Sequence, residues 1–215
     1  HLYNEENNEQ KEINYLKEGK NIAVVSDRGT PVISDPGYVL AKTAIEEGFN
    51  VVCLPGPTAV IPAIVMSGLA GGPFTFYGFL NSKESKRKNE LESLKNQTFP
   101  IAFYEAPHRI EKTIKSIIDV FGNRKAAIVR EISKKYKEVI RGDLNYLLKE
   151  IPNIKGEIVL VVDGNHETKT FGNLSIKDHV NLYIEDGLSS KEAIKKVAKE
   201  RGIPKSEVYN EYHEL

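Results

Sequence analysis

The chain has 215 residues, and its 30 basic and 30 acidic side chains give a formal net charge of zero at pH 7. A chain of this length can bury a sizeable core, and 40% hydrophobic residues is ordinary for a globular protein. The balanced charge excludes an overall basic field, so any nucleic-acid contact must come from a local patch. The single cysteine, Cys53, excludes an intrachain disulfide and a cysteine-based zinc site, and it fits a reducing, cytoplasmic compartment. No apolar run approaches the roughly 20 residues of a membrane-spanning helix.

Residues 22–37 join a strand signal to a loop rich in glycine and proline. Ile22–Ser26 is short and β-branched, like a strand buried on both faces of a parallel sheet. Gly29 permits positive φ, and two prolines stiffen the loop, which an apolar helical pattern follows. A loop at the carboxyl end of a strand is where α/β sheets bind ligands, although a tightly turned structural loop has the same composition.

A short helix is expected at Glu9–Lys17, before residues 22–37. A second unit with the same pattern of strand, loop and helix follows those residues. We expect a strand at Asn50–Leu54, a Pro-Gly-Pro turn, and an apolar helix that Thr58 caps and that reaches Leu69. Two successive units of strand, loop and helix predict parallel strands with right-handed crossovers. Both loops should therefore open at the same edge of a sheet, within an incomplete first lobe of residues 1–71.

Strands and helices alternate again in an expected second lobe of residues 72–165. The strand signals lie at 74–79, 101–104, 126–132, 136–141 and 157–163. Helical patterns lie at 84–94, after Pro107, and at 144–150. In the helix after Pro107, a spacing of three to four residues puts one set of side chains on the same side: Ile110, Ile114, Ile117, Ile118 and Phe121. The neighbouring strands around Lys134 indicate an antiparallel pair and therefore a mixed sheet.

The tail, residues 174–215, has a helical pattern throughout. Gly187 ends a first helix, Ser189 and Glu192 form a capping box for a second, and a turn at Gly202 leads to a third. This punctuation is typical of a helix-turn-helix, and equally of a compact structural cap.

The common nucleotide-binding motifs are absent. The chain has neither G-x-x-x-x-G-K-[ST] nor G-x-G-x-x-G after a strand, which argues against a nucleoside triphosphatase. Its five histidines lack metal-ligand spacing, so we predict no metal. Residues 103–109 place aromatic, acidic, imidazole and guanidinium groups at the carboxyl end of a strand, where a simple helix cap is the alternative interpretation.

Five short motifs occur together in one order. They are Ser26–Pro31 with Ser34–Gly37, Leu54–Ala59, Gly78–Leu80, Tyr104–Arg109 and Arg130–Lys134. With these motifs the chain resembles the small-subunit ribosomal RNA methyltransferase I family, the ribose 2′-O-methylating members of the tetrapyrrole methylase superfamily. The resemblance implies a two-lobed α/β protein with a partial parallel-sheet first lobe, a mixed-sheet second lobe and a C-terminal helical tail.

The resemblance also implies that S-adenosylmethionine binds between the lobes. The first-lobe residues implied are Ser26, Asp27, Gly29, Thr30, Pro31, Pro55, Gly56, Pro57, Thr58 and Ala59. Those of the second lobe are Phe103, Tyr104 and Glu105, with the backbone of residues 156–159. The implied substrate is a cytidine ribose in the rRNA of the small (30S) subunit, and the implied assembly is a homodimer.

A ribose hydroxyl is a poor nucleophile at neutral pH, so a base or a cation near the developing alkoxide should help. Glu105, Glu131 and Lys134 are the candidates by residue type and motif, and positioning without a dedicated base is the alternative. The candidate RNA-binding residues are Lys83, Lys86, Arg87, Lys88, His108, Arg109 and Lys134, with a further basic group at Lys135, Lys137 and Arg141. A solvated charged face is the alternative for these groups.

Two other functions remain open: a tetrapyrrole C-methyltransferase of the precorrin or uroporphyrinogen type, and a non-catalytic nucleic-acid-binding module. The chain departs from the family pattern in one large respect. The family's opening Thr-Pro-Ile-Gly-Asn loop and its acidic Glu-Asp-Thr-Arg motif do not occur here. The segment His1–Glu5 matches a family segment that lies after them. We therefore expect the first lobe to lack part of its sheet and this chain alone to be weakly active.

Overall fold

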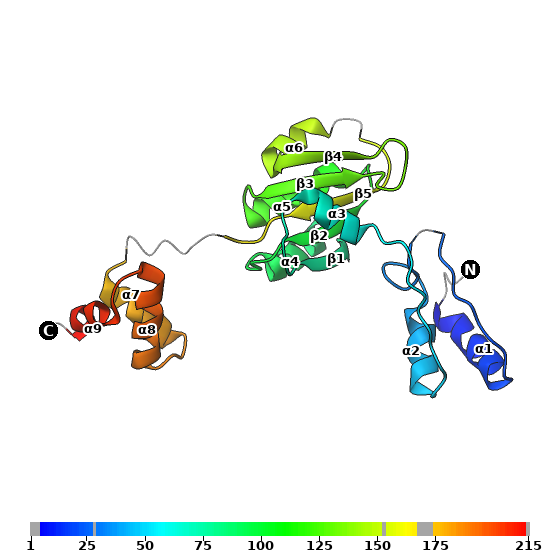
Figure 1. Ribbon diagram of the computed structural model, residues 1–215, viewed down its shortest axis with the longest axis horizontal. Coiled ribbons are helices and arrows are strands. Elements are labelled where there is room, and N and C mark those ends of the chain that lie inside the picture. Colours follow the sequence, from blue (N-terminus) through cyan, green and yellow to red (C-terminus); the bar gives the residue numbers. More distant parts are fainter. Residues whose placement is uncertain (1–4, 28, 152–153, 167–173, 214–215) are drawn as a thin grey trace. The chain divides into compact units, whose positions relative to one another are not determined.

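The computed structural model describes residues 5–27, 29–151, 154–166 and 174–213 (Figure 1). The chain forms two compact units, His1–Asn165 and His166–Leu215. Within the described ranges, no helix combines the length and hydrophobicity needed to cross a bilayer.

A five-stranded mixed sheet lies at the centre of the larger unit. Its strands are β1 (Thr75–Phe79), β2 (Ile101–Glu105), β3 (Lys125–Arg130), β4 (Glu138–Asp143) and β5 (Ile158–Val162). They lie in the order β1-β2-β5-β3-β4, with β1 and β2 parallel and the other neighbours antiparallel. The strands predicted for the second lobe are thus confirmed, as is the antiparallel pair on either side of Lys134.

Helices cover both faces of this sheet. On one face lie α4 (Glu84–Leu94), α5 (Ile110–Phe121) and α6 (Leu144–Glu150), whose apolar side chains share a core with Phe103 and Leu160. The predicted spacing explains α5, because Ile110, Ile114, Ile117 and Phe121 fall on one side of the helix and are all buried.

The opposite face carries α3 (Val60–Ser67), which packs on Ala102, Val129, Val159 and Val161 (Figure 1). Alternate residues of a strand point to opposite faces, so Ala102 meets α3 while Phe103 meets α5. The helix that precedes residue 71 therefore packs on the sheet that follows it. Its N-cap is Ala59 and carries no side-chain cap, so the prediction of Thr58 as the N-cap is wrong.

Residues 5–58 form α1 (Glu5–Lys17) and α2 (Tyr38–Glu46), which pack together through Ile13, Leu40 and Ala44. The segments predicted as strands, 22–26 and 50–54, form no strand and pair with none among the described residues. The prediction of strands there is wrong, because a β-branched run becomes a strand only beside a hydrogen-bonded neighbour. Val25 and Leu54 are consequently 85% and 78% exposed, whereas Ile22 and Val24 pack against the small core of α1 and α2.

The C-terminal unit is a bundle of α7 (Ile176–Glu185), α8 (Ser190–Arg201) and α9 (Lys205–His213), each in contact with the other two. Its core contains Val180, Ile194, Val197 and Val208. The predicted capping box at the start of α8 is confirmed, because the Ser189 and Glu192 side chains each bond the other residue's backbone N–H. Gly202 then ends α8 in the left-handed conformation, at φ 67°.

Candidate functional site

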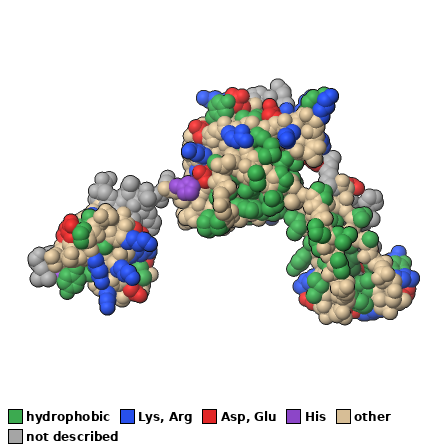
Figure 2. Space-filling model, in the orientation of Figure 1, with side chains coloured by type: hydrophobic (Ala, Val, Ile, Leu, Met, Phe, Trp, Pro, Cys, Tyr) green, Lys and Arg blue, Asp and Glu red, His purple; other side chains and the backbone are tan. Residues whose placement is uncertain are grey.

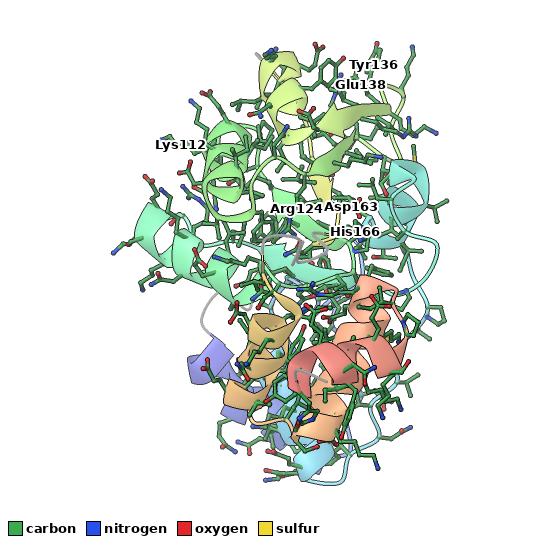
Figure 3. All side chains as sticks on the ribbon, turned by 90° about the vertical axis from the view of Figure 1, so that its left-hand side faces the viewer. Lys112, Arg124, Tyr136, Glu138, Asp163 and His166 are labelled. Atoms are coloured by element: carbon green, nitrogen blue, oxygen red, sulfur yellow. The ribbon has the colours of Figure 1, made fainter. Side chains whose placement is uncertain are left out.

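Three of the sequence motifs gather at one edge of the sheet. Strands β2 and β3 both run antiparallel to β5, so Glu105 and Arg130 each pair with Ile158 at its start. The parallel strand β1 ends at the same edge, where Phe79 pairs with Tyr104. We call this the motif edge. Figure 3 labels Glu138 at this edge, whereas Arg124 and Asp163 lie at the opposite one.

Glu105 is buried at the motif edge and fixes the loop that follows β2. One oxygen, Oε1, accepts a hydrogen bond from the Ala106 amide at 2.8 Å and lies 3.2 Å from Arg109 Nε. The other, Oε2, accepts from the Thr113 hydroxyl at 2.5 Å. Arg109 in turn donates to the Leu80 carbonyl at 2.6 Å, which ties the loop to β1. Because these partners use both carboxylate oxygens, the geometry favours a positioning role for Glu105 over that of a general base.

Phe103 and Tyr104 lie on opposite faces of the sheet. Phe103 is completely buried beneath α4 and α5, so its side chain is not available to a ligand. Tyr104 lies with the aromatic rings of Phe76 and Phe79, at centroid distances of 4.8 and 5.6 Å. Phe79 is half exposed, so this cluster presents an aromatic surface at the motif edge.

Glu131 follows β3 in a strained conformation, with φ at 52°. Its Oε1 accepts hydrogen bonds from Lys134 Nζ and the Glu157 amide, both at 2.9 Å. These two bonds, that of the Glu157 amide first, lower the pKa of Glu131, so it stays ionised and is a weak base at neutral pH. Its carboxyl group occupies the space beside Gly156, where an added Cβ would lie 2.3 Å from Oε1. Lys134 also lies 3.6 Å from the Glu157 carboxylate, so two acids hold this exposed ammonium.

The two loops expected to bind the cofactor touch each other. The Thr30 hydroxyl donates to the Pro57 carbonyl at 3.3 Å, and a Cβ on Gly29 would lie 3.4 Å from the same oxygen. Ser26 Oγ donates to Asp35 Oδ2 at 3.0 Å, which closes the first loop on itself. The loops predicted to open together therefore do meet.

The first of these loops also reaches β1. A Cβ added to Gly78 would lie 3.2 Å from the Ser34 hydroxyl oxygen. Gly78 has φ 85° and sits at a shift in the register between β1 and β2. Val32 and Ser34 have positive φ as well, at 75° and 64°, so the loop holds a strained shape. A glycine inside a strand pattern can signal the close approach of another segment, but it does not say which segment approaches.

The remaining first-loop residues lie close to these contacts. Asp27, Pro55, Gly56 and Pro57 are exposed. Pro31, Thr58 and Ala59 are half-buried, Ala59 against the α3 face of the sheet. The neighbouring Arg28 lies outside the described residues.

The structure divides the residues expected to contact RNA. Arg87 is buried: its Nε donates to the Ser116 hydroxyl at 3.0 Å and its Nη1 to the Ser82 carbonyl at 3.1 Å, so it is not available to a phosphate. Lys88 bridges Glu84 and Asp119 at 3.0 and 2.9 Å, and these two carboxylates raise its pKa. Arg109 is held by Glu105. The exposed members of the set are Lys83, Lys86, His108 and Lys134, with Lys135 and Lys137.

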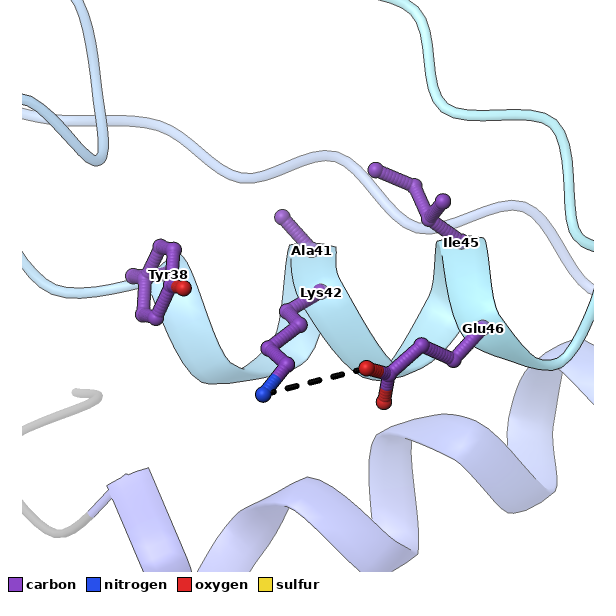
Figure 4. Close-up of a pocket in the computed structure, with 5 residues that line it drawn as sticks. All are labelled: Tyr38, Ala41, Lys42, Ile45 and Glu46. Carbon is purple, nitrogen blue, oxygen red and sulfur yellow. Dashed lines mark ion pairs between the residues drawn. The ribbon is translucent and has the colours of Figure 1, made fainter.

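Two open pockets are lined by residues outside the two loops expected to bind the cofactor. One of about 340 Å³ lies on α2 beside Tyr38, Ala41 and Ile45, where Lys42 pairs with Glu46 at 3.7 Å (Figure 4). The other, of about 520 Å³, lies at the start of α5 and includes Pro107 and His108. Among the described residues no group of histidine, cysteine and carboxylate side chains could hold a metal ion.

Comparison with known proteins gives consistent matches. Residues 2–147 match the sequence model of the Tetrapyrrole (Corrin/Porphyrin) Methylases. The chain is 45% identical over 221 positions to ribosomal RNA small subunit methyltransferase I of Bacillus subtilis (strain 168), covering 99% of this chain and 76% of the relative.

Solved structures of the same fold include the methyltransferase CobJ, with a TM-score of 0.55 and 18% identity over 73% of this chain and 70% of that one. Another is uroporphyrin-III C-methyl transferase from Thermus thermophilus complexed with S-adenyl homocysteine. Its TM-score is 0.50 and its identity 15%, over 72% of this chain and 73% of that one. At these identities the structures support the fold and not the substrate.

Proposed function

Because the chain belongs to the tetrapyrrole methylase family, we propose that it methylates small-subunit ribosomal RNA with S-adenosylmethionine, at the 2′-oxygen of a cytidine ribose. The observation that carries this proposal is the meeting of the Gly29 loop with the Pro57 loop and with Gly78 of β1. It brings the loops of residues 5–58 to the motif edge, where the aromatic and charged groups of the second-lobe motifs also lie.

The residues present at this place fit the methyl donor. Glycines at 29 and 78 let the first loop lie close to Pro57 and to β1, since both have positive φ and close neighbours. The partly buried Tyr104 ring and the half-exposed Phe79 ring offer an apolar surface for adenine, and the Ser26, Asp27 and Thr30 side chains offer polar partners for the amino-acid and ribose ends. When bound, S-adenosylmethionine supplies an electrophilic methyl group to an attacking oxygen.

Among the candidate catalytic groups, we assign Lys134 the role of the cation. Glu105 is buried with both oxygens bonded, and Glu131 is held ionised, so neither is placed to take the ribose proton at neutral pH. Lys134 is exposed at the motif edge and held by two carboxylates. An ammonium in this position stabilises an alkoxide or binds the neighbouring phosphate, and the protein's main contribution is then positioning.

For the substrate, RNA is favoured over a tetrapyrrole by the relative named above, which is 45% identical over nearly the whole chain, its helical tail included. The exposed cations Lys83, Lys86, His108 and Lys134 add phosphate-binding groups to the larger unit. We further propose that the protein acts in the cytoplasm as a homodimer. Sedimentation analysis would test the oligomeric state.

The decisive test is methyl transfer to isolated small ribosomal subunits from labelled S-adenosylmethionine. We expect label in the rRNA at one cytidine, and that nucleotide should resist alkaline cleavage because its 2′-hydroxyl is blocked. Transfer to uroporphyrinogen III instead would support the tetrapyrrole alternative. Absence of transfer to both, by a chain that binds S-adenosylmethionine, would contradict the substrate assignment.

A further inference from the structure

The helix α8 carries five basic and two acidic side chains, and both acids are engaged within the C-terminal unit. Glu192 accepts from the Ser189 amide at 3.1 Å and from its hydroxyl at 2.5 Å, bonds that lower the pKa of Glu192. Glu200 accepts from the Tyr183 hydroxyl at 2.8 Å and lies 3.2 Å from His179 Nε2. Among the described residues, neither carboxylate forms an ion pair with a lysine of α8.

Two of the five basic side chains are engaged as well. Arg201 donates from Nε to His179 Nδ1 at 3.1 Å and from Nη2 to the Leu174 carbonyl at 2.6 Å, which fastens the end of α8 to the start of α7. Lys196 lies over the Tyr183 ring, 4.0 Å from its centroid.

The other three basic residues, Lys191, Lys195 and Lys199, form what we call the basic face of α8. They lie four residues apart on the side away from the buried Ala193 and Val197, and all three are exposed. Across the described residues, no carboxylate forms an ion pair with any of them. With a rise of about 1.5 Å per residue, they form a row about 12 Å long. Figure 2 shows lysine and arginine side chains gathered on this unit.

The exposed side of the next helix, α9, carries both acidic and basic side chains. In a helix-turn-helix the second helix enters the groove of the nucleic acid, yet α9 exposes Glu207 and Glu211 alongside Lys205. Carboxylates on that helix are repelled by the phosphates on either side of a groove. The unit is therefore suited to contact with the backbone and not to reading of bases, since phosphate contacts position a protein without specifying sequence.

We propose that the C-terminal unit holds the RNA substrate by its phosphate backbone through the basic face of α8. The inference rests on the proposed function, which makes RNA the substrate. A membrane surface is disfavoured because the described residues of this unit expose few large apolar side chains, Leu174 at 37% and Tyr209 at 46%. The unit would supply affinity for the RNA, and the residues of the motif edge would supply the chemistry.

The test compares two triple variants of the full chain. K191Q/K195Q/K199Q removes the basic face, whereas K42Q/K95Q/K115Q removes three lysines that pair with Glu46, Glu92 and Glu111. Both variants lose the same charge, and circular dichroism should show unchanged helix content in both. Fluorescence anisotropy then measures binding of a labelled small-subunit rRNA fragment over a range of salt concentrations.

We expect the basic-face variant to bind RNA about tenfold or more weakly, with its log K against log salt slope reduced by about 2, since each phosphate contact contributes ~0.7–0.9. The control should keep nearly the wild-type slope. Equal slopes and affinities for the two variants would overturn the inference. It would also be overturned if the basic-face variant bound RNA as the wild type does but no longer bound anionic lipid vesicles.

Methyl transfer by the same preparations separates this inference from the proposed function. If the wild-type chain transfers no methyl group but the basic-face variant still loses RNA affinity, the proposed reaction fails and the RNA contact stands. If the wild-type chain methylates rRNA and the variant binds RNA as the wild type does, the contact through α8 fails and the reaction stands.

Discussion

Similar apolar runs adopt different structures in the sheet of β1–β5 and in residues 5–58. The run at 158–162 in β5 lies between β2 and β3, and Leu160 and Val161 are completely buried. The runs at 22–26 and 50–54 are also rich in β-branched residues, but Val25 and Leu54 face solvent. The difference shows that a β-branched run predicts the capacity to form a strand, whereas the strand itself depends on neighbours on both sides.

The cores of the two regions differ accordingly. Among the described residues, seventeen buried residues form the core between the sheet and α4, α5 and α6, whereas three, Ile13, Leu40 and Ala44, form that of residues 5–58. The loops proposed to bind the cofactor therefore belong to the less buried region, and they are braced against the better packed one at Gly78. Ligand binding should stabilise residues 5–58 more than the sheet.

The largest expected effect comes from replacing one apolar side chain with alanine in each of the two regions. Leu160→Ala removes a fully buried side chain from the central strand and should lower the free energy of unfolding by about 3 kcal/mol. Val52→Ala, at a side chain in the extended segment that is 69% exposed, should change it by less than about 0.5 kcal/mol. Urea titration of the two variants makes the measurement. Similar losses would mean that residues 50–54 are buried in solution.

A pair of glycine substitutions tests the motif edge. Gly156→Ala forces a Cβ to within 2.3 Å of Glu131 Oε1 at φ 87°, whereas Gly19→Ala, at φ 80°, meets nothing within 4 Å. Both carry the conformational cost of about 1 kcal/mol, but only Gly156→Ala must also displace the carboxylate that holds Lys134. We expect it to cost about 1–2 kcal/mol more in thermal unfolding and to reduce methyl transfer. Equal stability and activity of the two variants would show that Glu131 moves aside freely.

The smallest effect concerns the buried polar groups of the C-terminal unit. Burial, followed by the hydrogen bond to Glu200, raises the pKa of Tyr183 to about 12. Because the folded-state pKa lies above the unfolded value of about 10, the neutral phenol stabilises the unit fully below pH 10 and loses this contribution as pH rises toward 12. The loss should be small, because solvent screens the phenol in part, and it should be seen as a falling melting temperature at alkaline pH. Tyr183→Phe should flatten that dependence, and an unchanged profile would exclude Tyr183 as its source.

The sequence predicted the sheet region well because its signals were periodic and locally complete. The spacing of Ile110, Ile114 and Ile117 defined the buried side of α5, and Ser189 with Glu192 defined the start of α8. The burial of Arg87 was not predicted, although it lies four and seven residues before Leu91 and Leu94 and thus on the same helix side.

The candidate site shows similar limits. Phe103 and Tyr104 were both assigned to the cofactor, but adjacent residues of a strand face opposite sides, so one of them had to point into the core. The loop contacts through Ser34 and Gly78 join segments far apart in the chain, and only the folded structure shows them. The missing strands at 22–26 and 50–54 also depend on long-range pairing, which local patterns do not report.

Calorimetric titration of the chain with S-adenosylmethionine tests most directly the claim that the loops of residues 5–58 form the cofactor site. We expect saturable binding to the wild-type chain and none to Gly29→Val, because a β-branched side chain is strained at φ 77° and fills the space beside Pro57. Gly19→Val, at a glycine with open surroundings, should bind like the wild type. Unchanged affinity of the Gly29→Val variant would contradict the assignment of these loops to the cofactor.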